Sequence, residues 1–318
     1  MFNISFWNCG LAPLKNSTII EDNAIIEDNA IIVKDIIISI FEDEDLSVHF
    51  LILCEVNQSA IDLIKKLISE SSAINLSYMP YVSRASTHAS FDMLIIFKSS
   101  HCNIPSDISA IKYNTNHPTK DDFLYKDGTT TKAGIFIEVN VTGENERLYI
   151  IASHWPSDAF PTGKEKRAEA ARKIKSVSDS HIESGKQLLL IGDYNTPPHA
   201  TVLRETMSVK HSKIVAIKSS YNLYNASFNL MKPHVYHSKA TANERLSYGT
   251  YIWKNNHDSE DGCAILDQVL VSSHFISEGP WHLVESNVKY IYNSLTEKYI
   301  DYKNQLIDHL PIYVSVEK

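Results

Sequence analysis

The sequence lacks the long apolar runs that would place it in a membrane. Its longest apolar stretches, such as Ile36 to Ile40 and Leu188 to Ile191, fall far short of the roughly 20 residues that cross a bilayer. After Met1 there is no basic segment followed by an apolar one, which argues against a signal peptide. We therefore expect a cytoplasmic protein without a membrane partner.

Cysteine and positive charge are also scarce. The chain has only four cysteines, with no CxxC pair and no histidines at zinc-finger spacing, so we expect them to be reduced and mostly buried. They are Cys9, Cys54, Cys102 and Cys263. A formal net charge of -8 argues against a surface that attracts polyanions throughout, because such binding needs Lys and Arg to neutralise phosphates. It leaves room for a local basic groove or for bound metal ions.

The composition is that of a globular protein with a large core. Hydrophobic residues make up 43% of the chain and charged residues 21%, which excludes a disordered chain. No linker rich in proline, glycine or serine divides it. We expect a single domain over residues 1–318, since large β structures with flanking helices reach this size without splitting.

Short apolar runs bounded by polar, glycine or proline residues predict many β-strands. The predicted strands are Asn3 to Trp7, Val48 to Cys54, Phe91 to Phe97, Ile135 to Val141, Leu148 to Ser153, Leu188 to Gly192, Ile265 to Val271 and Pro311 to Val316. Helical spacing of apolar residues predicts helices around Ile32 to Ile40, Ile61 to Ile68 and Ala168 to Val177. On the last helix we expect the basic residues to form a solvated face; they are Lys166, Arg167, Arg172 and Lys173.

Several predicted strands run directly into a residue that can bind a metal or a phosphate. These residues are Asn8, Glu55, His154 and Asp193. Groups held at strand ends are carried by rigid backbone, which keeps their geometry tight. The repetition indicates a shared site more strongly than any one of these residues does.

The segments around Asp193 and around Glu55 each have a functional and an ordinary interpretation. In an extended backbone Asp193 and Asn195 point to the same side while Tyr194 points into packing, although Gly, Asp, Asn and Pro also favour a simple turn. Glu55 follows a fully apolar strand, where a carboxylate is costly unless a cation such as Mg²⁺ faces it. The alternative is that Glu55 begins the following helix, where acidic residues suit the dipole.

Four further residues suggest acid/base chemistry. His154 can donate a hydrogen bond to a phosphoryl oxygen, although a lone histidine is often structural. Asp308 and His309 are adjacent, and Asp267 lies on another predicted strand, Ile265 to Val271. A histidine oriented by an aspartate supplies the acid/base pair that hydrolysis needs.

Taken together, these motifs resemble the endonuclease/exonuclease/phosphatase superfamily. They are Asn8 in FWNCG, Glu55 in LCEVN, His154 in SHWPS, Asp193 and Asn195 in GDYN, Asp267 in LDQVLVS, and Asp308 with His309 in DHLPI. The resemblance covers nearly the whole chain and implies an α/β fold, a four-layer α/β/β/α sandwich with two packed mixed β-sheets. SHWPS before a Lys/Arg/Ala-rich helix, together with Gly249 to Tyr251 (GTY), further resembles a bacterial subgroup of unassigned substrate.

The chain departs from the family's pattern at three positions. Ile307 stands where a serine commonly precedes the Asp-His pair, and Tyr194 replaces the usual phenylalanine. Asp158 follows WPS, where the subgroup tends to have an arginine that contacts phosphate. That contact would then fall to a basic residue of the next helix: Lys164, Lys166 or Arg167.

The resemblance also implies a divalent metal ion, Mg²⁺ or Mn²⁺, as cofactor. Glu55 would bind it with help from Asn8, and Asp308 would contribute directly or through water.

The same resemblance implies roles for the remaining site residues. Asp267 would fix the tautomer of His309, and either His309 or Asp193 would deprotonate the attacking water. Asn195 and His154 would hold non-bridging phosphoryl oxygens.

For the substrate, we favour a nucleic acid cleaved at its phosphodiester bonds. The long polar stretches Lys112 to Lys132 and His234 to Gly262 are expected to be loops bordering the site, and the first carries lysines and aromatic residues that could contact bases. Acidic residues in the same stretch also fit a plain solvated loop. The alternatives are a phosphatase for a small metabolite or lipid headgroup, and a catalytically silent binding scaffold.

Overall fold

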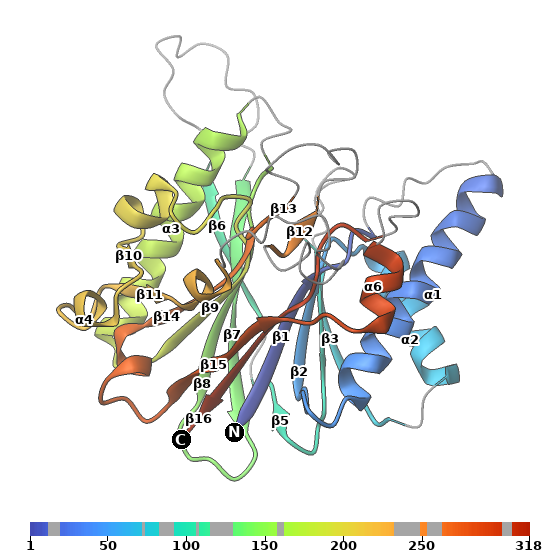
Figure 1. Ribbon diagram of the computed structural model, residues 1–318, viewed down its shortest axis with the longest axis horizontal. Helices are drawn as coiled ribbons and strands as arrows, with labels where there is room; N and C mark the ends of the chain where they lie inside the picture. Colours follow the sequence, from blue (N-terminus) through green and yellow to red (C-terminus); the bar gives the residue numbers. More distant parts are fainter. Residues whose placement is uncertain are drawn as a thin grey trace, which may run out of the picture.

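Two mixed β-sheets pack face to face in the centre of the computed structural model, with helices on their outer sides (Figure 1). The structure describes residues 1–11, 20–71, 74–82, 92–105, 108–114, 130–157, 162–231, 249–252, 263–300 and 307–318. The arrangement confirms the predicted α/β/β/α sandwich.

The first sheet has six strands in the order β15-β16-β1-β2-β4-β3. Their bounds are β1 Phe2–Asn8, β2 Phe50–Cys54, β3 Ser77–Tyr81, β4 Met93–Phe97, β15 His282–Tyr290 and β16 Ile312–Glu317. Strand β1 is central, pairing in parallel with β2 and antiparallel with β16. The two ends of the chain therefore lie side by side in one sheet (Figure 1).

The second sheet follows the order β10-β11-β14-β9-β8-β7-β5, with β6 paired to β7. Its strands are β5 Cys102–Asn103, β6 Ser109–Asn114, β7 Thr130–Val141, β8 Leu148–His154, β9 Leu188–Asp193, β10 Val209–Lys210, β11 Leu223–Asn225 and β14 Asp267–Ser272. Strands β8 and β9 are parallel, and β14 runs antiparallel to β9.

Apolar residues on both faces of the central strands build three core layers. In β2, Phe50, Ile52 and Cys54 enter the layer between the sheets, whereas Leu51 and Leu53 face the helices. Strands buried on both faces consist almost entirely of apolar residues, and for this reason they can be predicted from the sequence. Cys9, Cys54 and Cys102 are free and buried, as expected, and the side chain of Cys263 lies outside the described residues.

The helices form the outer layers. They are α1 Ile20–Glu42, α2 Gln58–Ser71, α3 Gly163–Glu183, α4 Lys213–Ala216 and α6 Ser294–Ile300, with short η1 Val202–Thr206, η2 Ala226–Leu230 and η3 Ser273–Ile276. Helices α1 and α2 cover the first sheet and α3 covers the second. Within the described ranges, none of these helices combines the length and apolarity needed to span a bilayer.

All eight predicted strands are present, with shifted ends. Strand β7 begins at Thr130 and pairs with β6, so both ends of the predicted loop Lys112 to Lys132 are strand; its middle lies outside the described residues. Strand β14 begins at Asp267 instead of Ile265. Most of His234 to Gly262 also lies outside the described residues, but Gly249 to Ile252 is described and carries strand β12 Tyr251–Ile252.

One prediction about α3 is wrong. Arg167 is not solvated: it is 6% exposed, and its Nη1 donates a hydrogen bond to the carbonyl of Pro156 at 2.9 Å. Arg172 and Lys173 are exposed, as expected. A buried arginine needs such an acceptor, because removing its charge from water is otherwise costly.

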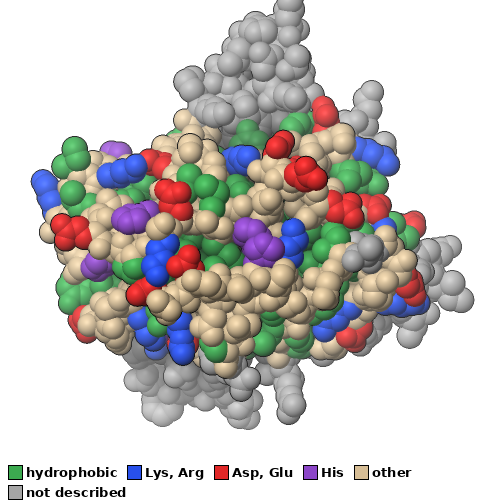
Figure 2. Space-filling view, turned by 90° about the horizontal axis from the view of Figure 1, so that it is seen from below, with side chains coloured by type: hydrophobic (Ala, Val, Ile, Leu, Met, Phe, Trp, Pro, Cys, Tyr) green, Lys and Arg blue, Asp and Glu red, His purple; other side chains and the backbone are tan. Residues whose placement is uncertain are grey.

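The end of the sandwich where both termini lie carries a mixture of acidic, basic and histidine side chains (Figure 2). Figure 2 views this end, and acidic and basic side chains alternate over the residues drawn in colour without forming one large patch of a single sign. The ends of β1, β2, β8 and β9 point the other way (Figure 1).

Candidate active site

Strand topology brings the predicted site residues to one end of the two sheets. Asn8 and Cys54 are register partners in the parallel pair β1/β2, so Glu55 emerges beside Asn8. His154 and Asp193 are partners in the parallel pair β8/β9. Asp193 is also the partner of Asp267, the first residue of antiparallel β14. Five strands therefore deliver polar side chains to the same end of the two sheets.

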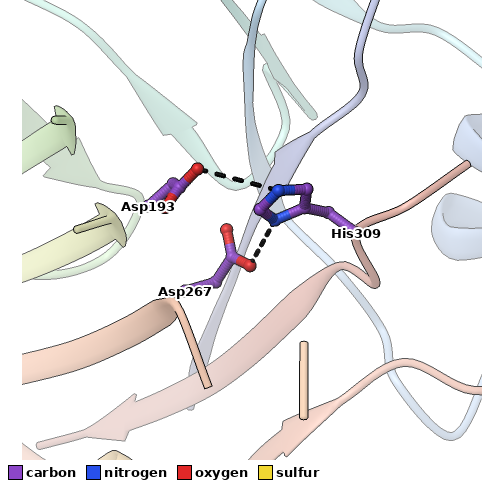
Figure 3. Close-up of side chains that lie close together, drawn as sticks. All are labelled: Asp193, Asp267 and His309. Atoms are coloured by element: carbon purple, nitrogen blue, oxygen red, sulfur yellow. Dashed lines mark hydrogen bonds and ion pairs between the residues drawn. The ribbon is translucent and has the colours of Figure 1, made fainter. Parts of the chain in front are cut away.

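At the centre of this edge, an imidazole lies between two carboxylates (Figure 3). His309 Nδ1 is 2.8 Å from Asp267 Oδ2, and His309 Nε2 is 3.8 Å from Asp193 Oδ2. The three residues are 5%, 0% and 1% exposed, respectively. One ligand atom of each lies within 4.8 Å of the others, so the group also has the spacing of a metal site.

Burial and charge perturb this group strongly. Burial alone would lower the pKa of His309, but the negative charges of Asp267 and Asp193 outweigh it and raise the pKa to about 10. Burial raises the pKa of Asp193 above its ordinary value, and the nearby carboxylate of Asp267 acts in the same direction. Asp267 Oδ1 is buried and has no hydrogen-bond partner among the described residues.

Two amides hold Asp193 in place. Its Oδ2 accepts hydrogen bonds from Asn8 Nδ2 at 3.1 Å and from Asn195 Nδ2 at 3.2 Å, and its Oδ1 accepts the backbone N–H of Asn195 at 2.8 Å. Asn195 and Asp193 thus converge as predicted, but the proposed reason is wrong. Asn195 has a φ of 48°, so a left-handed turn and not an extended backbone brings the amide back. Tyr194 packs edge-on against Trp155, as expected.

Glu55 reaches the site through a rare backbone conformation. Its φ is 56°, and α2 begins only at Gln58, so the alternative of a helix-starting Glu55 is wrong. Such a conformation in a non-glycine residue is strained and persists only where the surroundings impose it. The carbonyl of Cys54 accepts hydrogen bonds from the backbone N–H and the thiol of Cys9, which fixes the preceding peptide.

His154 pairs with Glu55 across the sheet boundary. His154 Nε2 lies 3.3 Å from Glu55 Oε1 and 3.8 Å from Asp193 Oδ2. Although burial opposes both shifts, the pairing with Glu55 raises the pKa of His154, and the hydrogen bond from His154 lowers the pKa of Glu55. The pair joins the two sheets electrostatically at this edge.

Asp308 completes the acidic side of the site. It is exposed, its pKa is raised chiefly by desolvation and also by the negative charge of Glu55, and its Oδ1 lies 3.8 Å from the position a Cβ would take on Gly10. The backbone N–H of Gly10 in turn donates to Asn8 Oδ1 at 3.3 Å. Asp308, Glu55 and Asn8 therefore occupy one neighbourhood.

The charges and donors of this site suit a divalent cation. Its four carboxylates, on Glu55, Asp193, Asp267 and Asp308, face only two imidazoles, on His154 and His309. Carboxylate and amide oxygens are the ligands that Mg²⁺ prefers. Asp267 Oδ1, buried and without a hydrogen-bond partner among the described residues, adds to the acceptors that no donor satisfies at this end of the sheets.

The structure gives a local explanation for one departure from the family's pattern, at Ile307. Ile307 is 4% exposed and packs in the core layer beneath α1 and α2, where a hydroxyl would gain nothing. Asp158 lies outside the described residues. Of the three basic residues expected to replace the arginine, Arg167 donates to the carbonyl of Pro156 in the SHWPS segment, and Lys164 is exposed.

Sequence reasoning missed three residues that support His309. Trp7 Nε1 donates to the carbonyl of His309 at 2.9 Å, and the ring of Tyr251 lies 4.7 Å from the imidazole, centroid to centroid. Thr250 accepts two backbone hydrogen bonds, one from Leu310 to its carbonyl and one from Asp267 to its hydroxyl. For Thr250 and Tyr251, the only sequence signal was the GTY motif, which supported the family resemblance but indicated no role for either residue.

Comparisons with known proteins agree with this architecture. A family model described as "Endonuclease/Exonuclease/phosphatase family" matches residues 28–318. No curated protein sequence matches the chain. The fold is similar to a functionally unknown conserved protein from Enterococcus faecalis V583 (TM-score 0.60, 13% identity, 99% of each chain covered). It is also similar to a Bacteroides thetaiotaomicron mannosyl-6-phosphatase (0.57, 12%, 100% of each) and to D. rerio TDP2 complexed with single-strand DNA product (0.56, 13%, 100% and 99%).

Proposed function

Since the chain belongs to the endonuclease/exonuclease/phosphatase family, we propose that it hydrolyses phosphoester bonds with the aid of a divalent metal ion. The observation that carries the proposal is the buried His309 imidazole, held by Asp267 on one side and facing Asp193 on the other. This arrangement lies beside an oxygen-rich group with surplus negative charge. We take residues 1–318 as one catalytic domain.

Glu55, Asn8 and Asp308 are the residues we assign to the metal ion, either Mg²⁺ or Mn²⁺. All three present oxygen atoms to the same neighbourhood, and the negative charge of Glu55 is close enough to raise the pKa of Asp308. When bound there, the ion would neutralise charge on the phosphoryl oxygens and stabilise the leaving oxygen.

His309 and Asp193 are the residues we assign to the attacking water. Asp267 accepts the Nδ1 hydrogen of His309, which leaves Nε2 facing Asp193 Oδ2. At 3.8 Å these two atoms are too far apart for a direct hydrogen bond, so both can approach the same water. Asp193 can receive the proton of this water as it stands, whereas His309, with its pKa raised to about 10, would do so only where a bound cation lowers that pKa. The two groups titrate as a coupled pair because each lies in the electric field of the other.

His154 and Asn195 are assigned to the non-bridging phosphoryl oxygens. His154 has a raised pKa, which favours the protonated, donating form at neutral pH. Asn195 Nδ2 already donates to the carbonyl of Trp155 at 2.8 Å and to Asp193 at 3.2 Å. It would exchange the longer of these bonds for one to the substrate.

For the substrate we propose a nucleic acid phosphodiester, with a small phosphorylated metabolite as the second candidate. The first draws support from the likeness to TDP2 complexed with single-strand DNA product, and from the basic and aromatic residues of Lys112 to Lys132, most of which lie outside the described residues. The second draws support from the likeness to a mannosyl-6-phosphatase and from the net charge of -8, which disfavours a polyanion.

One panel tests both levels of the proposal. Purified protein is incubated with Mg²⁺ or Mn²⁺ and with plasmid, single-stranded DNA, RNA, abasic duplex, sugar and inositol phosphates, and a generic phosphodiester. We expect metal-dependent hydrolysis that chelator abolishes, with nucleic acid cut fastest. Turnover of only the small compounds would replace the first substrate by the second, and metal-independent turnover would contradict the mechanism.

A further inference from the structure

The four residues from Gly249 to Ile252 lie between the two segments that carry the Asp267–His309 pair. On one side, the backbone N–H of Thr250 donates to the carbonyl of Ala264 at 2.9 Å, within the pairing of β12 with β13 Cys263–Ala264. On the other side, Leu310 N–H donates to the carbonyl of Thr250 at 2.6 Å, and Ile252 N–H donates to the carbonyl of Asp308 at 2.8 Å. This segment is therefore hydrogen-bonded to both neighbours.

The side chain of Thr250 adds a second connection to Asp267. Thr250 is fully buried, and its Oγ1 accepts the backbone N–H of Asp267 at 2.9 Å and that of Leu266 at 3.1 Å. These N–H groups sit where β14 begins, immediately before the ladder in which Asp267 partners Asp193. The hydroxyl thus fixes the backbone position from which the Asp267 carboxylate extends into the site.

The glycine before Thr250 allows this close approach. A Cβ on Gly249 would lie 2.4 Å from the carbonyl oxygen of Ala264, a distance that backbone atoms cannot accommodate without moving. Two residues of the GTY motif therefore have a structural role in this chain. The glycine permits contact with the segment before Asp267, and the threonine forms hydrogen bonds with that segment. Tyr251, the third residue, lays its ring 4.7 Å from that of His309.

We propose that Thr250 is a positioning residue that sets the geometry of the Asp267–His309 pair, an inference that rests on the proposed function of this site. Its carbonyl holds the segment of His309 and its hydroxyl holds Asp267, so a single rigid residue ties the two halves of the pair together. The 2.8 Å contact between Asp267 and His309 depends on both ties. Misplacement of a catalytic group by about 1 Å can cost on the order of a hundredfold in rate.

Two substitutions of Thr250 and one control separate positioning from plain structure. Thr250→Val keeps the shape but removes the oxygen, and Thr250→Ser keeps the oxygen but removes the methyl group. The control is Ser272→Ala at the opposite end of β14, where a fully buried Oγ accepts the N–H of Leu188 at 3.1 Å. Thr250→Val leaves two buried backbone N–H groups without their acceptor, and the control leaves one, away from the site.

The first measurement is turnover of a phosphodiester by each metal-loaded variant, below the unfolding temperature of the least stable one. We expect Thr250→Val to lower kcat by about 10- to 100-fold with little change in KM. Thr250→Ser and Ser272→Ala should stay within about threefold of the unmodified protein. If Thr250→Val behaves like Ser272→Ala, the positioning role is wrong while the proposed function stands.

The second measurement needs neither metal nor substrate. A buried imidazole N–H that donates to a carboxylate gives a far-downfield proton resonance, which here is assigned by its loss in His309→Asn. We expect the resonance to keep its position in Thr250→Ser and Ser272→Ala and to shift or vanish in Thr250→Val. That result in a protein without turnover would refute the proposed function and leave the positioning role intact. An unshifted resonance in Thr250→Val, or none in the unmodified protein, would overturn the inference.

Discussion

Replacing Glu55 by glutamine is the perturbation that separates a metal ligand from an ordinary hydrogen-bonding group. Glutamine keeps the size of the side chain and an oxygen that can accept from His154, which lies 3.3 Å from the Glu55 carboxylate. It removes the negative charge. If Glu55 holds a dication, this change should abolish the stabilisation that the ion confers on the folded protein.

The expected size of the effect follows from mass action. An ion at 100 times its dissociation constant stabilises the folded state by about 2.7 kcal/mol. Unfolding entropy of about 2.1 cal/mol/K per residue, over 318 residues, is about 0.7 kcal/mol/K, so Tm should rise by about 4 °C. If glutamine weakens binding by about a hundredfold, the same concentration gives about 0.4 kcal/mol and a rise under about 1 °C.

The assay is a thermal melt with and without Mn²⁺, at one ion concentration for all variants. Glu70→Gln provides the matched control, because Glu70 is an exposed residue of α2 and the substitution changes net charge by the same amount. The control should keep the full rise. An equal rise in Glu55→Gln would refute the assignment of Glu55 to the metal.

Three further predictions follow from other parts of the fold. His309→Ala and Asp193→Ala should each lower kcat by about a hundredfold or more while circular dichroism stays native, and near-normal turnover in either would contradict the mechanism. Gly192→Ala should lower the free energy of unfolding by about 3 kcal/mol or more in urea titrations, because its Cβ would lie 2.1 Å from the carbonyl oxygen of Ser153. Burial lowers the pKa of His49 from 6.5 to about 4. Between these two pH values, His49 is therefore protonated in the unfolded chain and neutral in the folded one. Its contribution, up to about 3 kcal/mol, is present above pH 6.5 and lost as pH falls toward 4. A smaller loss of stability over that range in His49→Asn would support this, and an equal loss would count against it.

The part of the site that rests on strand order was predictable from the sequence. Asn8, His154 and Asp193 each end a strand buried on both faces, and parallel neighbours carry such ends to one edge. Because these strands are continuous apolar runs, their ends were visible to within one or two residues. The fold class followed from the same pattern together with the family resemblance.

The parts that rest on backbone conformation were not predictable. Glu55 and Asn195 face the site because each has a positive φ. Residue type gives no sign of this at Glu55, and at Asn195 it indicates only that a turn is favoured. Arg167 is buried because one carbonyl accepts its guanidinium, a contact that helical periodicity cannot reveal. Thr250 is hydrogen-bonded to two segments that are distant from it in the sequence, so the local GTY motif marked the residue without indicating these contacts.

The most direct test of the account is the position of a bound cation. A crystal grown with Mn²⁺ and measured at the manganese absorption edge should show one anomalous peak about 2.1 Å from a carboxylate oxygen of Glu55, with Asn8 and Asp308 close by. A peak enclosed instead by Asp193, Asp267 and His309, or no peak at this end of the sheets, would contradict the assignment of Glu55, Asn8 and Asp308 as the metal ligands.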